Sequence, residues 1–343
     1  MSKTLALVGN PNCGKTTLFN ELTGSSQYVG NWPGVTVEKK AGKLKGHSDI
    51  EVMDLPGVYS LSPYTLEEVI TRDYLLEERP SVIVNIVDAS NLERNLYLTT
   101  QILELGIPVV VALNMMDIIR KNGDEINIAN LAGELGCPVY PIEAANGVGL
   151  AEMLKEAISL AEMKIKTYSL PLFKGNLNKT LKEIERLFDD EIPEHLRSWF
   201  AVKLFERDEK VLAKHKMFHN MRVKTEQIIT QYEDEVDDDA ESIITNARYE
   251  YISSIINRCI TKKRKSHELS TSDKIDRILT NRILALPIFF LIMWFVYYVS
   301  IQTLGDLSTG FMEDTFAAIS DSLGGMMEEA GVSATLQSLI LDG

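Results

Sequence analysis

The sequence feature that most constrains the fold is the run Gly-Asn-Pro-Asn-Cys-Gly-Lys-Thr at residues 9–16. It lies between an apolar run at residues 5–8 and a predicted helix at residues 17–22. This pattern is typical of a phosphate-binding loop, in which backbone N–H groups point at phosphate oxygens near a helix N-terminus. In such a loop Lys15 reaches the β- and γ-phosphates and the Thr16 hydroxyl ligates Mg²⁺. A chance glycine-rich turn is the alternative interpretation.

Residues 1–165 alternate short apolar runs with helical patterns. The apolar runs predict strands at residues 5–8, 50–54, 82–87, 109–113 and 139–142. Helices are predicted at residues 17–22, 65–76, 92–105, 131–135 and 150–161. Strands that alternate with helices favour an α/β fold, a mostly parallel sheet with helices on both faces. Ligands bind such sheets at the carboxyl ends of the strands.

Three further motifs follow predicted strands. Residues 54–57 (Asp-Leu-Pro-Gly) can hold Mg²⁺ through water, and the Gly57 N–H can face a γ-phosphate. Residues 114–117 (Asn-Met-Met-Asp) can hold a guanine, because the Asp117 carboxylate accepts from the ring N1–H and the exocyclic amine, donors that adenine lacks. Residues 143–145 (Glu-Ala-Ala) are placed for a further base contact. Four such motifs in this order indicate a guanine-nucleotide site.

Residues 24–45 join the first helix to the second predicted strand, and their glycines, proline and asparagine predict a mobile loop. Thr36 is the natural second Mg²⁺ ligand when GTP is bound. The loop would then order on the γ-phosphate and relax after hydrolysis. An ordinary strand threonine is the alternative interpretation of Thr36.

Four stretches together resemble the GTP-binding domain of the FeoB family of bacterial ferrous iron transporters: residues 9–16, 31–36 (Asn-Trp-Pro-Gly-Val-Thr), 54–57 and 114–117. Trp32 and Met115, the latter at a position where most GTPases carry lysine, are the specific points. The broader resemblance is to GTPases of the Era type. The FeoB resemblance extends from the start of the chain to its first membrane helix, and it implies a Ras-like P-loop GTPase fold.

The predicted nucleotide-binding residues all lie in these loops: Gly9, Asn10, Pro11, Asn12, Cys13, Gly14, Lys15, Thr16, Thr17, Gly34, Val35, Thr36, Val37, Glu38, Asp54, Leu55, Pro56, Gly57, Asn114, Met115, Met116, Asp117, Glu143, Ala144 and Ala145. Those predicted to act in catalysis are Lys15, Thr36 and Gly57. Those predicted to ligate Mg²⁺, directly or through water, are Thr16, Thr36 and Asp54.

Four positions bear on mechanism. Ras-like enzymes orient the attacking water with a glutamine after Asp-x-x-Gly, but Val58 cannot do this, so backbone groups of residues 30–36 are the expected substitute. Asn12 matches the asparagine that holds K⁺ in FeoB-like GTPases, where the cation supplies charge in place of an arginine finger. A turn residue is the alternative interpretation of Asn12.

Glu143 opens a loop that departs from the usual Ser-Ala, and this departure predicts fast GDP release. Cys13 lies near a helix N-terminus, yet a small loop residue is favoured over a redox role.

Residues 166–270 lose the strand pattern. Helices are predicted at residues 177–188, 196–205, 210–216, 223–232 and 240–260. They favour a small helical domain, and the FeoB resemblance implies that this domain slows GDP dissociation and links the nucleotide state to the membrane. His215 and His219 share one helix face, and residues 233–239 are acidic. Surface histidines and a solvated loop are favoured over metal sites.

Residues 283–301 carry no charged side chain and would span ~28 Å as a helix, close to the ~30 Å core of a bilayer. Lys and Arg residues cluster before this segment, between positions 262 and 282, and none occurs in residues 302–343. This positive-inside pattern predicts a membrane helix with its N-terminal side in the cytoplasm. A buried core helix is the alternative. Apolar runs at residues 311–319, 323–327 and 336–341 predict amphipathic helices outside the membrane.

We therefore expect a GTP-binding domain at residues 1–165, a helical domain at 166–270, and at 271–343 a basic juxtamembrane segment, the membrane helix and an acidic extracytoplasmic segment. The expected function is hydrolysis of GTP with Mg²⁺ and K⁺, with the nucleotide state coupled to Fe²⁺ uptake across the inner (plasma) membrane. The iron role comes from the family resemblance alone. The expected partners are the guanine nucleotide, the membrane, the remaining transmembrane region of the transporter, a small cytosolic accessory protein and a second copy of the chain.

Composition narrows the alternatives. A net charge of −14, from 35 basic and 49 acidic side chains, argues against a nucleic-acid partner. It therefore disfavours an RNA- or ribosome-associated GTPase of the Era type. The other alternative is a nucleotide-controlled binding switch with negligible turnover, which Val58 motivates. Three cysteines without close spacing fit a reduced, cytosolic setting.

Overall fold

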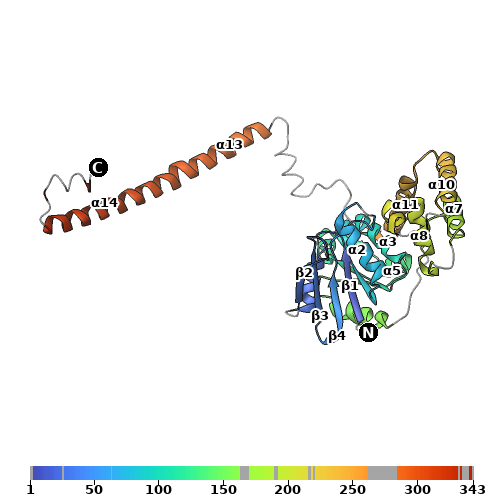
Figure 1. Ribbon diagram of the computed structural model, residues 1–343. Coiled ribbons are helices and arrows are strands. Elements are labelled where there is room, and N and C mark those ends of the chain that lie inside the picture. The colour runs from blue at the N-terminus through green and yellow to red at the C-terminus, as the bar shows by residue number, and fades with distance from the viewer. Residues whose placement is uncertain are drawn as a thin grey trace. The chain divides into compact units, whose positions relative to one another are not determined.

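The computed structural model describes residues 3–24, 27–62, 64–162, 170–188, 192–214, 218, 221–261, 284–330, 333 and 340–341. The chain divides into two compact units, residues 1–264 and 265–343 (Figure 1). The predicted division of the first unit near residue 165 stays a prediction. The paired histidines, His215 and His219, and the basic residues between positions 262 and 282 lie outside the described residues.

A seven-stranded sheet forms the centre of the first unit, in the order β2-β3-β4-β1-β5-β6-β8. Its strands are β1 (Lys3–Gly9), β2 (Gln27–Asn31), β3 (Glu38–Leu44), β4 (His47–Asp54), β5 (Val82–Asp88), β6 (Val109–Asn114) and β8 (Val139–Pro141). The pairs β1–β4, β1–β5, β5–β6 and β6–β8 are parallel, and β2–β3 and β3–β4 are antiparallel. All five predicted strands are present, and the mostly parallel α/β fold is confirmed.

The prediction of a loop throughout residues 24–45 is wrong, because β2 and β3 form an antiparallel hairpin there. Ala41 and Leu44 of β3 are buried, and Ala41 pairs with Met53 of β4. Gly42 and Lys43 between Ala41 and Leu44, and Lys39 and Lys40 before them, weaken the alternating pattern that would have predicted a strand. The loop is confined to residues 32–37, where Trp32 N–H donates to Val37 O at 2.9 Å.

Helices cover both faces of the sheet (Figure 1). In the first part of the unit they are α1 (Lys15–Thr23), α2 (Leu66–Glu77), the 3₁₀ turn η1 (Ala89–Asn91), α3 (Leu92–Leu103), α4 (Met116–Asn122), α5 (Ile128–Leu135) and α6 (Leu150–Ala161). Side chains of a strand alternate between the two faces. Leu5 and Leu7 therefore join the apolar core under α1 and α6, whereas Ala6 and Val8 join the core on the opposite face.

The second part of the unit is helical: α7 (Gly175–Glu185), α8 (Glu194–Phe205), α9 (Glu209–Lys214), α10 (Arg222–Val236) and α11 (Ala240–Cys259). Its buried residues, Trp199 and Phe205 among them, continue the core formed by Ala6 and Val8. The expectation that strands vanish after residue 166 needs one correction. The short strand β9 (Ile260–Thr261) pairs antiparallel with β7 (Glu125–Ile126), because the end of α11 returns to the sheet-containing part of the chain.

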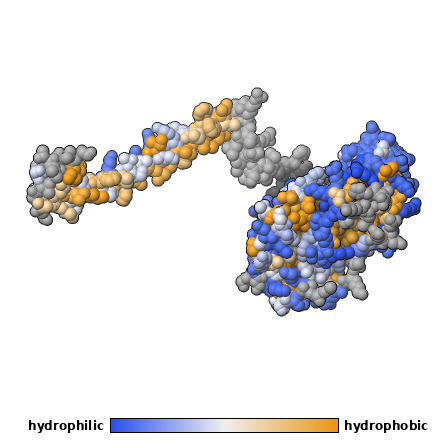
Figure 2. Space-filling model, in the orientation of Figure 1, coloured by the Kyte–Doolittle hydropathy of each residue, from blue (hydrophilic) through white to orange (hydrophobic). Residues whose placement is uncertain are grey.

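The second unit contains one long helical run made of α13 (Ala285–Tyr297), the π-helix η3 (Tyr298–Gly305) and α14 (Asp306–Glu329). Within the described residues, Ala285–Met327 is the one helical stretch long and apolar enough to cross a membrane. Figure 2 shows hydrophobic residues along its exposed surface. The predicted separate helices at residues 311–319 and 323–327 lie together in α14, which continues through Gly324 and Gly325.

Candidate functional site

The carboxyl ends of β1, β4, β6 and β8 bring the four sequence motifs to one edge of the sheet. The phosphate-binding loop follows β1, Asp54 ends β4, Asn114 ends β6, and residues 143–145 come just after β8. Parallel strands place their carboxyl ends side by side, which is where ligands bind in this class of fold. The structure therefore assembles residues that lie far apart in the sequence.

The phosphate-binding loop depends on glycines that leave no room for a side chain. Gly14 has a left-handed φ of 93°, and a Cβ added there would lie 2.3 Å from Nδ2 of Asn114. A Cβ on Gly9 would lie 2.6 Å from Ile86 O, and one on Gly57 would lie 3.2 Å from Pro11 Cα. The loop is thus a backbone cradle at the start of α1, which fits an anionic phosphate group.

Lys15 forms an ion pair with Asp54, so the structure joins the two motifs that would hold phosphate and metal. Burial raises the pKa of Asp54, while the neighbouring Lys15 ammonium acts in the opposite direction. Asn10 is also buried, and neither atom of its amide group has a hydrogen-bond partner among the described residues. A lysine, a carboxylate and an unsatisfied amide at a helix start are suited to a nucleotide phosphate with a divalent cation.

Cys13 is almost fully buried, with 1% of its surface exposed, and burial raises the pKa of its thiol to about 11. Only the thiolate is strongly nucleophilic, so this thiol is unreactive near neutral pH. The structural role favoured by the sequence is consistent with this environment.

Asn114 bridges two loops. Its Nδ2 donates to Cys13 O at 2.9 Å, and its Oδ1 accepts from Ala144 N–H at 3.0 Å. The asparagine predicted to bind the base therefore also ties the phosphate-binding loop to the loop after β8. The sequence motif gives no sign of this bridge, because it depends on the meeting of three segments in space.

Asp117 lies in the first turn of α4 with its carboxylate exposed, as a base contact requires. Met115, just before the helix, has a left-handed φ of 64°, which is uncommon for a residue other than glycine. Asn12 in the phosphate-binding loop has a similar φ of 65° and is exposed. Thr16 and Thr17 are exposed at the start of α1.

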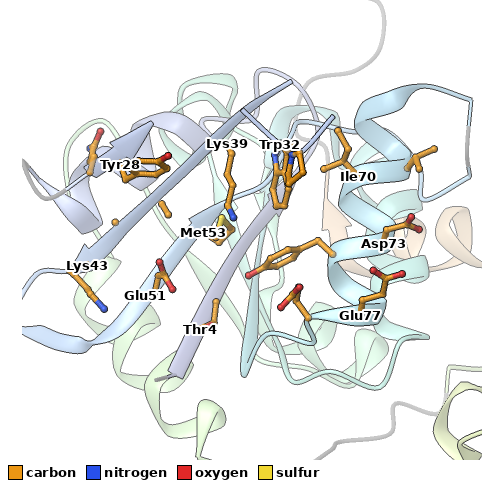
Figure 3. Close-up of a pocket in the computed structure, with 17 residues that line it drawn as sticks. Thr4, Tyr28, Trp32, Lys39, Lys43, Glu51, Met53, Ile70, Asp73 and Glu77 are labelled. Atoms are coloured by element: carbon orange, nitrogen blue, oxygen red, sulfur yellow. The ribbon is translucent and has the colours of Figure 1, made fainter. Parts of the chain in front are cut away.

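Thr36 is exposed in the loop between β2 and β3, and within the described residues no hydrogen bond joins it to Lys15, Thr16 or Asp54. Among the predicted magnesium ligands, Asp54 is linked to the phosphate-binding loop through Lys15, and no such contact reaches Thr36 within the described residues. The same loop carries Trp32, whose ring packs edge-on against Tyr74 of α2 at 5.5 Å, with Lys39 Nζ 4.9 Å from the ring centroid. These residues border a groove of about 990 Å³ between the sheet and α2 (Figure 3).

Val58 is buried, and its N–H donates to Gly9 O at 3.2 Å. Its side chain belongs to the apolar core, so it cannot orient a water molecule. The expectation that Val58 cannot take the place of the water-orienting glutamine is therefore consistent with the burial of its side chain.

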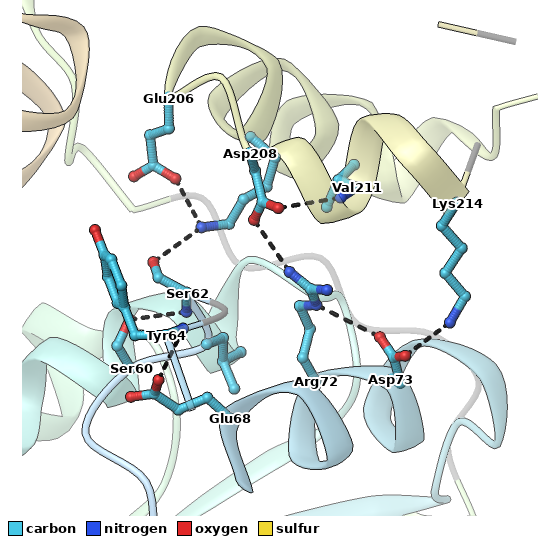
Figure 4. Close-up of polar contacts among 12 residues, drawn as sticks. Ser60, Ser62, Tyr64, Glu68, Arg72, Asp73, Glu206, Asp208, Val211 and Lys214 are labelled. Atoms are coloured by element: carbon cyan, nitrogen blue, oxygen red, sulfur yellow. Dashed lines mark hydrogen bonds and ion pairs between the residues drawn. The ribbon is translucent and has the colours of Figure 1, made fainter. Parts of the chain in front are cut away.

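The helix that follows the Asp54–Gly57 motif is fixed to the helical part of the unit. Arg72 of α2 pairs with Asp208 at 3.0 Å, and both side chains are buried. Asp73 pairs with Lys214 at 2.8 Å, and Lys203 donates to Ser62 Oγ at 3.3 Å (Figure 4). Sequence analysis missed these contacts. These contacts connect the helix after the Asp54–Gly57 motif directly to the helical part.

The fold and the site together define a P-loop GTPase. The family model for ferrous iron transport protein B matches residues 3–157, and the model for the FeoB cytosolic helical domain matches residues 173–261. The chain belongs to the FeoB family, as the sequence resemblance indicated.

Three similar proteins place the chain within the family. It is 39% identical over 319 residues to the Fe(2+) transporter FeoB of Escherichia coli K12, covering 90% of this chain and 40% of that protein. It is 37% identical over 357 residues to an Fe(2+) transport protein A/Fe(2+) transporter FeoB fusion protein of Porphyromonas gingivalis, covering 99% and 41%. A crystal structure of NFeoB from S. thermophilus bound to GDP·AlF4⁻ and K⁺ is 43% identical, with a TM-score of 0.68, covering 74% of this chain and 99% of that one. The chain thus spans about two fifths of these curated relatives.

Proposed function

We propose that this chain binds GTP at the carboxyl edge of the sheet and hydrolyses it to GDP and phosphate. The observation that carries the proposal is the glycine cradle at residues 9–16, with Lys15 paired to Asp54 and Gly57 packed against Pro11. Lys15 and the Gly57 N–H stabilise charge on the γ-phosphate. Asp117 and the backbone of residues 144–145 hold the guanine.

Two cations complete the proposed site. Thr16, Thr36 and Asp54 would hold Mg²⁺, and Asn12 would hold K⁺. The cations supply positive charge beside the phosphates, where other GTPases use an arginine finger. Thr36 is exposed in the 32–37 loop and would join the other ligands as the loop orders on the γ-phosphate. The S. thermophilus relative, solved with GDP·AlF4⁻ and K⁺, supports both the nucleotide and the monovalent ion.

The test is GTP turnover by residues 1–264, which form a compact unit, with Mg²⁺ in KCl and then in NaCl at equal ionic strength. We expect GTP but not ATP to be hydrolysed, faster in KCl, and an Asn12→Ala variant to lose the difference between the salts. Equal turnover of ATP would contradict the base assignment. Equal slow rates in both salts would remove the potassium site.

We further propose that the chain is the nucleotide-controlled part of an Fe²⁺ transporter in the inner membrane. The relatives named as Fe(2+) transporters, the membrane-length stretch Ala285–Met327 and the positive-inside charge pattern support this. The proposed orientation places the GTP-binding domain, residues 1–165, and the helical domain, residues 166–270, in the cytoplasm. Within the described residues no group of three or more His, Cys, Asp or Glu side chains could hold a metal ion, so the iron pathway would belong to the remaining transporter region.

Partners are part of the same proposal. The P. gingivalis relative, named as a fusion with Fe(2+) transport protein A, supports a small accessory protein as partner. Iron uptake by membrane vesicles that carry a transporter including this chain tests the transport role. Uptake that persists unchanged in a Lys15→Ala variant would contradict nucleotide control.

A binding switch with negligible turnover is the second candidate, because Val58 is buried and offers no water-positioning group. A switch would show a GTP-dependent change in affinity for a partner while phosphate release stays at background. Multiple turnovers on the timescale of that binding would exclude it.

A further inference from the structure

An ion pair joins the two segments that would hold the guanine. Nη1 of Arg120 in α4 lies 2.8 Å from Oε1 of Glu143, the first residue of the loop after β8. Arg120 follows Asp117 by three positions, so the two share one side of the helix. Glu143 directly precedes Ala144, whose N–H binds Asn114. We call the Arg120–Glu143 pair the clip.

The Glu143 end of the clip is fixed. Its side chain is only 11% exposed, whereas that of Arg120 is 64% exposed. The second carboxylate oxygen accepts from Asn146 Nδ2 at 3.0 Å, and the backbone of Glu143 pairs with Val148 in both directions, at 3.1 and 3.3 Å. The carboxylate is therefore presented to α4 by a loop that is closed on itself, and Arg120 is the arm that reaches it.

Two links now connect the region of Asp117 to the loop at residues 143–148. The inner link is the buried hydrogen bond from Ala144 to Asn114, and the outer link is the half-exposed clip. Asp117 lies in the sequence between the α4-side members of the two links. Loss of the outer link would leave the buried hydrogen bond as the remaining one of these two links. The solvent-exposed ends of the two segments could then separate.

We propose that the clip is a positioning pair that holds the two base-binding segments together and slows release of guanine nucleotide. The proposal rests on the proposed GTP-binding function. Arg120 acts through Asp117 and the 143–148 loop, without touching the nucleotide. This also changes the sequence-based expectation that the Glu-Ala-Ala loop favours fast GDP release: Glu143 itself slows it.

The size of the effect follows from the exposure of the pair. Ion pairs of this kind change an equilibrium by about twofold to fivefold. Arg120→Ala should therefore speed GDP release about threefold. Arg120→Glu should speed it about tenfold, because it places two carboxylates together. Arg120→Lys keeps the charge and should restore most of the slow release.

The experiment is stopped-flow release of a fluorescent GDP analogue from residues 1–264 with Mg²⁺ and constant KCl. Lys121→Ala is the matched control, since Lys121 is the next cation on α4 and pairs with no described residue. Added choline chloride should speed release from the unsubstituted protein and leave Arg120→Ala nearly unchanged, because it screens the pair. The ratio of IDP to GDP release rates should fall in Arg120→Ala, since IDP lacks the 2-amine that a well-placed Asp117 recognises.

Unchanged GDP release in Arg120→Ala, or an equal acceleration in Lys121→Ala, would overturn the clip while leaving the proposed function intact. An unchanged IDP-to-GDP ratio would mean that Arg120 only stabilises the fold in general. That result would also overturn the clip proposal. Failure of the unsubstituted unit to bind GDP would instead overturn the proposed function, and the clip with it. Thermal unfolding of each variant checks that the fold is retained.

Discussion

The phosphate side and the base side of the site are built differently. On the base side, Asn114 forms two buried hydrogen bonds that join three segments. On the phosphate side, Lys15 is paired with Asp54, and Thr36 is exposed in the 32–37 loop, where no hydrogen bond within the described residues joins it to either. In the proposed function the base would therefore meet segments that are already joined, whereas the phosphates would compete with Asp54 for Lys15 and order the Thr36 loop. We therefore expect base recognition on the first side and conformational change on the second.

The phosphate side is also the side that is connected to the helical part of the unit. Arg72 and Asp73 lie on the helix that follows the Asp54–Gly57 motif, and both pair with residues of the helical part. Because the Arg72–Asp208 pair is buried, its geometry cannot change without exposing or separating two charges.

The largest expected effect comes from Arg72→Met. It leaves Asp208 buried without its partner, which costs about 3–5 kcal/mol in the free energy of unfolding. Urea unfolding of residues 1–264 measures the loss. The double variant Arg72→Met/Asp208→Leu should recover most of it, and Lys214→Ala, which removes an exposed partner, should cost less than about 1 kcal/mol. A double variant as unstable as the single one would contradict a pair-specific cost.

The substitution Gly14→Ala should disturb both the phosphate side and the base side. The left-handed φ of 93° costs about 1–2 kcal/mol for a residue with a Cβ, and the Cβ would also displace Asn114 from its two partners. We expect a total loss of about 2–4 kcal/mol and greatly weakened GDP binding by calorimetry. Gly147→Ala is the control, since its φ of 70° is similar but nothing lies within 4 Å of an added Cβ. Equal losses in the two variants would mean that the contact with Asn114 has no cost.

Asn114→Ala removes the bridge without backbone strain. Cys13 O and Ala144 N–H lose their partner, which should cost about 1–3 kcal/mol and loosen the base side. The exposed Asn130→Ala should change the unfolding free energy by less than about 0.5 kcal/mol. Hydrogen exchange at the Ala144 amide reports the same contact. Unchanged protection there would mean that the bridge does not form in solution.

The smallest predicted effect is the pH dependence that Cys13 confers. Its folded pKa of about 11 lies above the ordinary value, so burial of the neutral thiol stabilises the fold fully below about pH 9, and this stability is lost as pH rises towards 11. Between pH 8 and 10.5 the loss should be about 1–2 kcal/mol. A Cys13→Ala variant should lose that part of the pH dependence, while Cys137→Ala keeps it. Rapid labelling of Cys13 by thiol reagents in the folded protein would contradict its burial.

The sequence predicted the parts of the molecule that depend on local patterns. The five apolar strands and the four motifs at strand ends were identified because each signal lies within a short stretch, as in residues 9–16. The β2–β3 hairpin was missed because Lys39, Lys40 and Lys43 interrupt its apolar pattern. The roles assigned to the site residues stay predictions.

Contacts between distant segments could not be predicted from the sequence. Nothing in the local sequence pairs Asn114 with Ala144, Arg120 with Glu143 or Arg72 with Asp208. Each becomes informative only once the fold has brought its partner close. The position of Arg120 one turn after Asp117 was the one visible hint, since residues three apart on a helix share a side.

The pairing of β7 with β9 has a consequence for how the protein is made. Glu125 and Ile126 can pair with Thr261 and Ile260 only after the whole helical part has been synthesised. In the same way, Glu104 can form its ion pair only after the buried Arg248 has been synthesised. Translation therefore finishes the first unit just before it delivers the apolar stretch that begins at Ala285. A fragment cut near residue 165 would lack the strand and the arginine that complete it, whereas one cut after residue 261 would keep both.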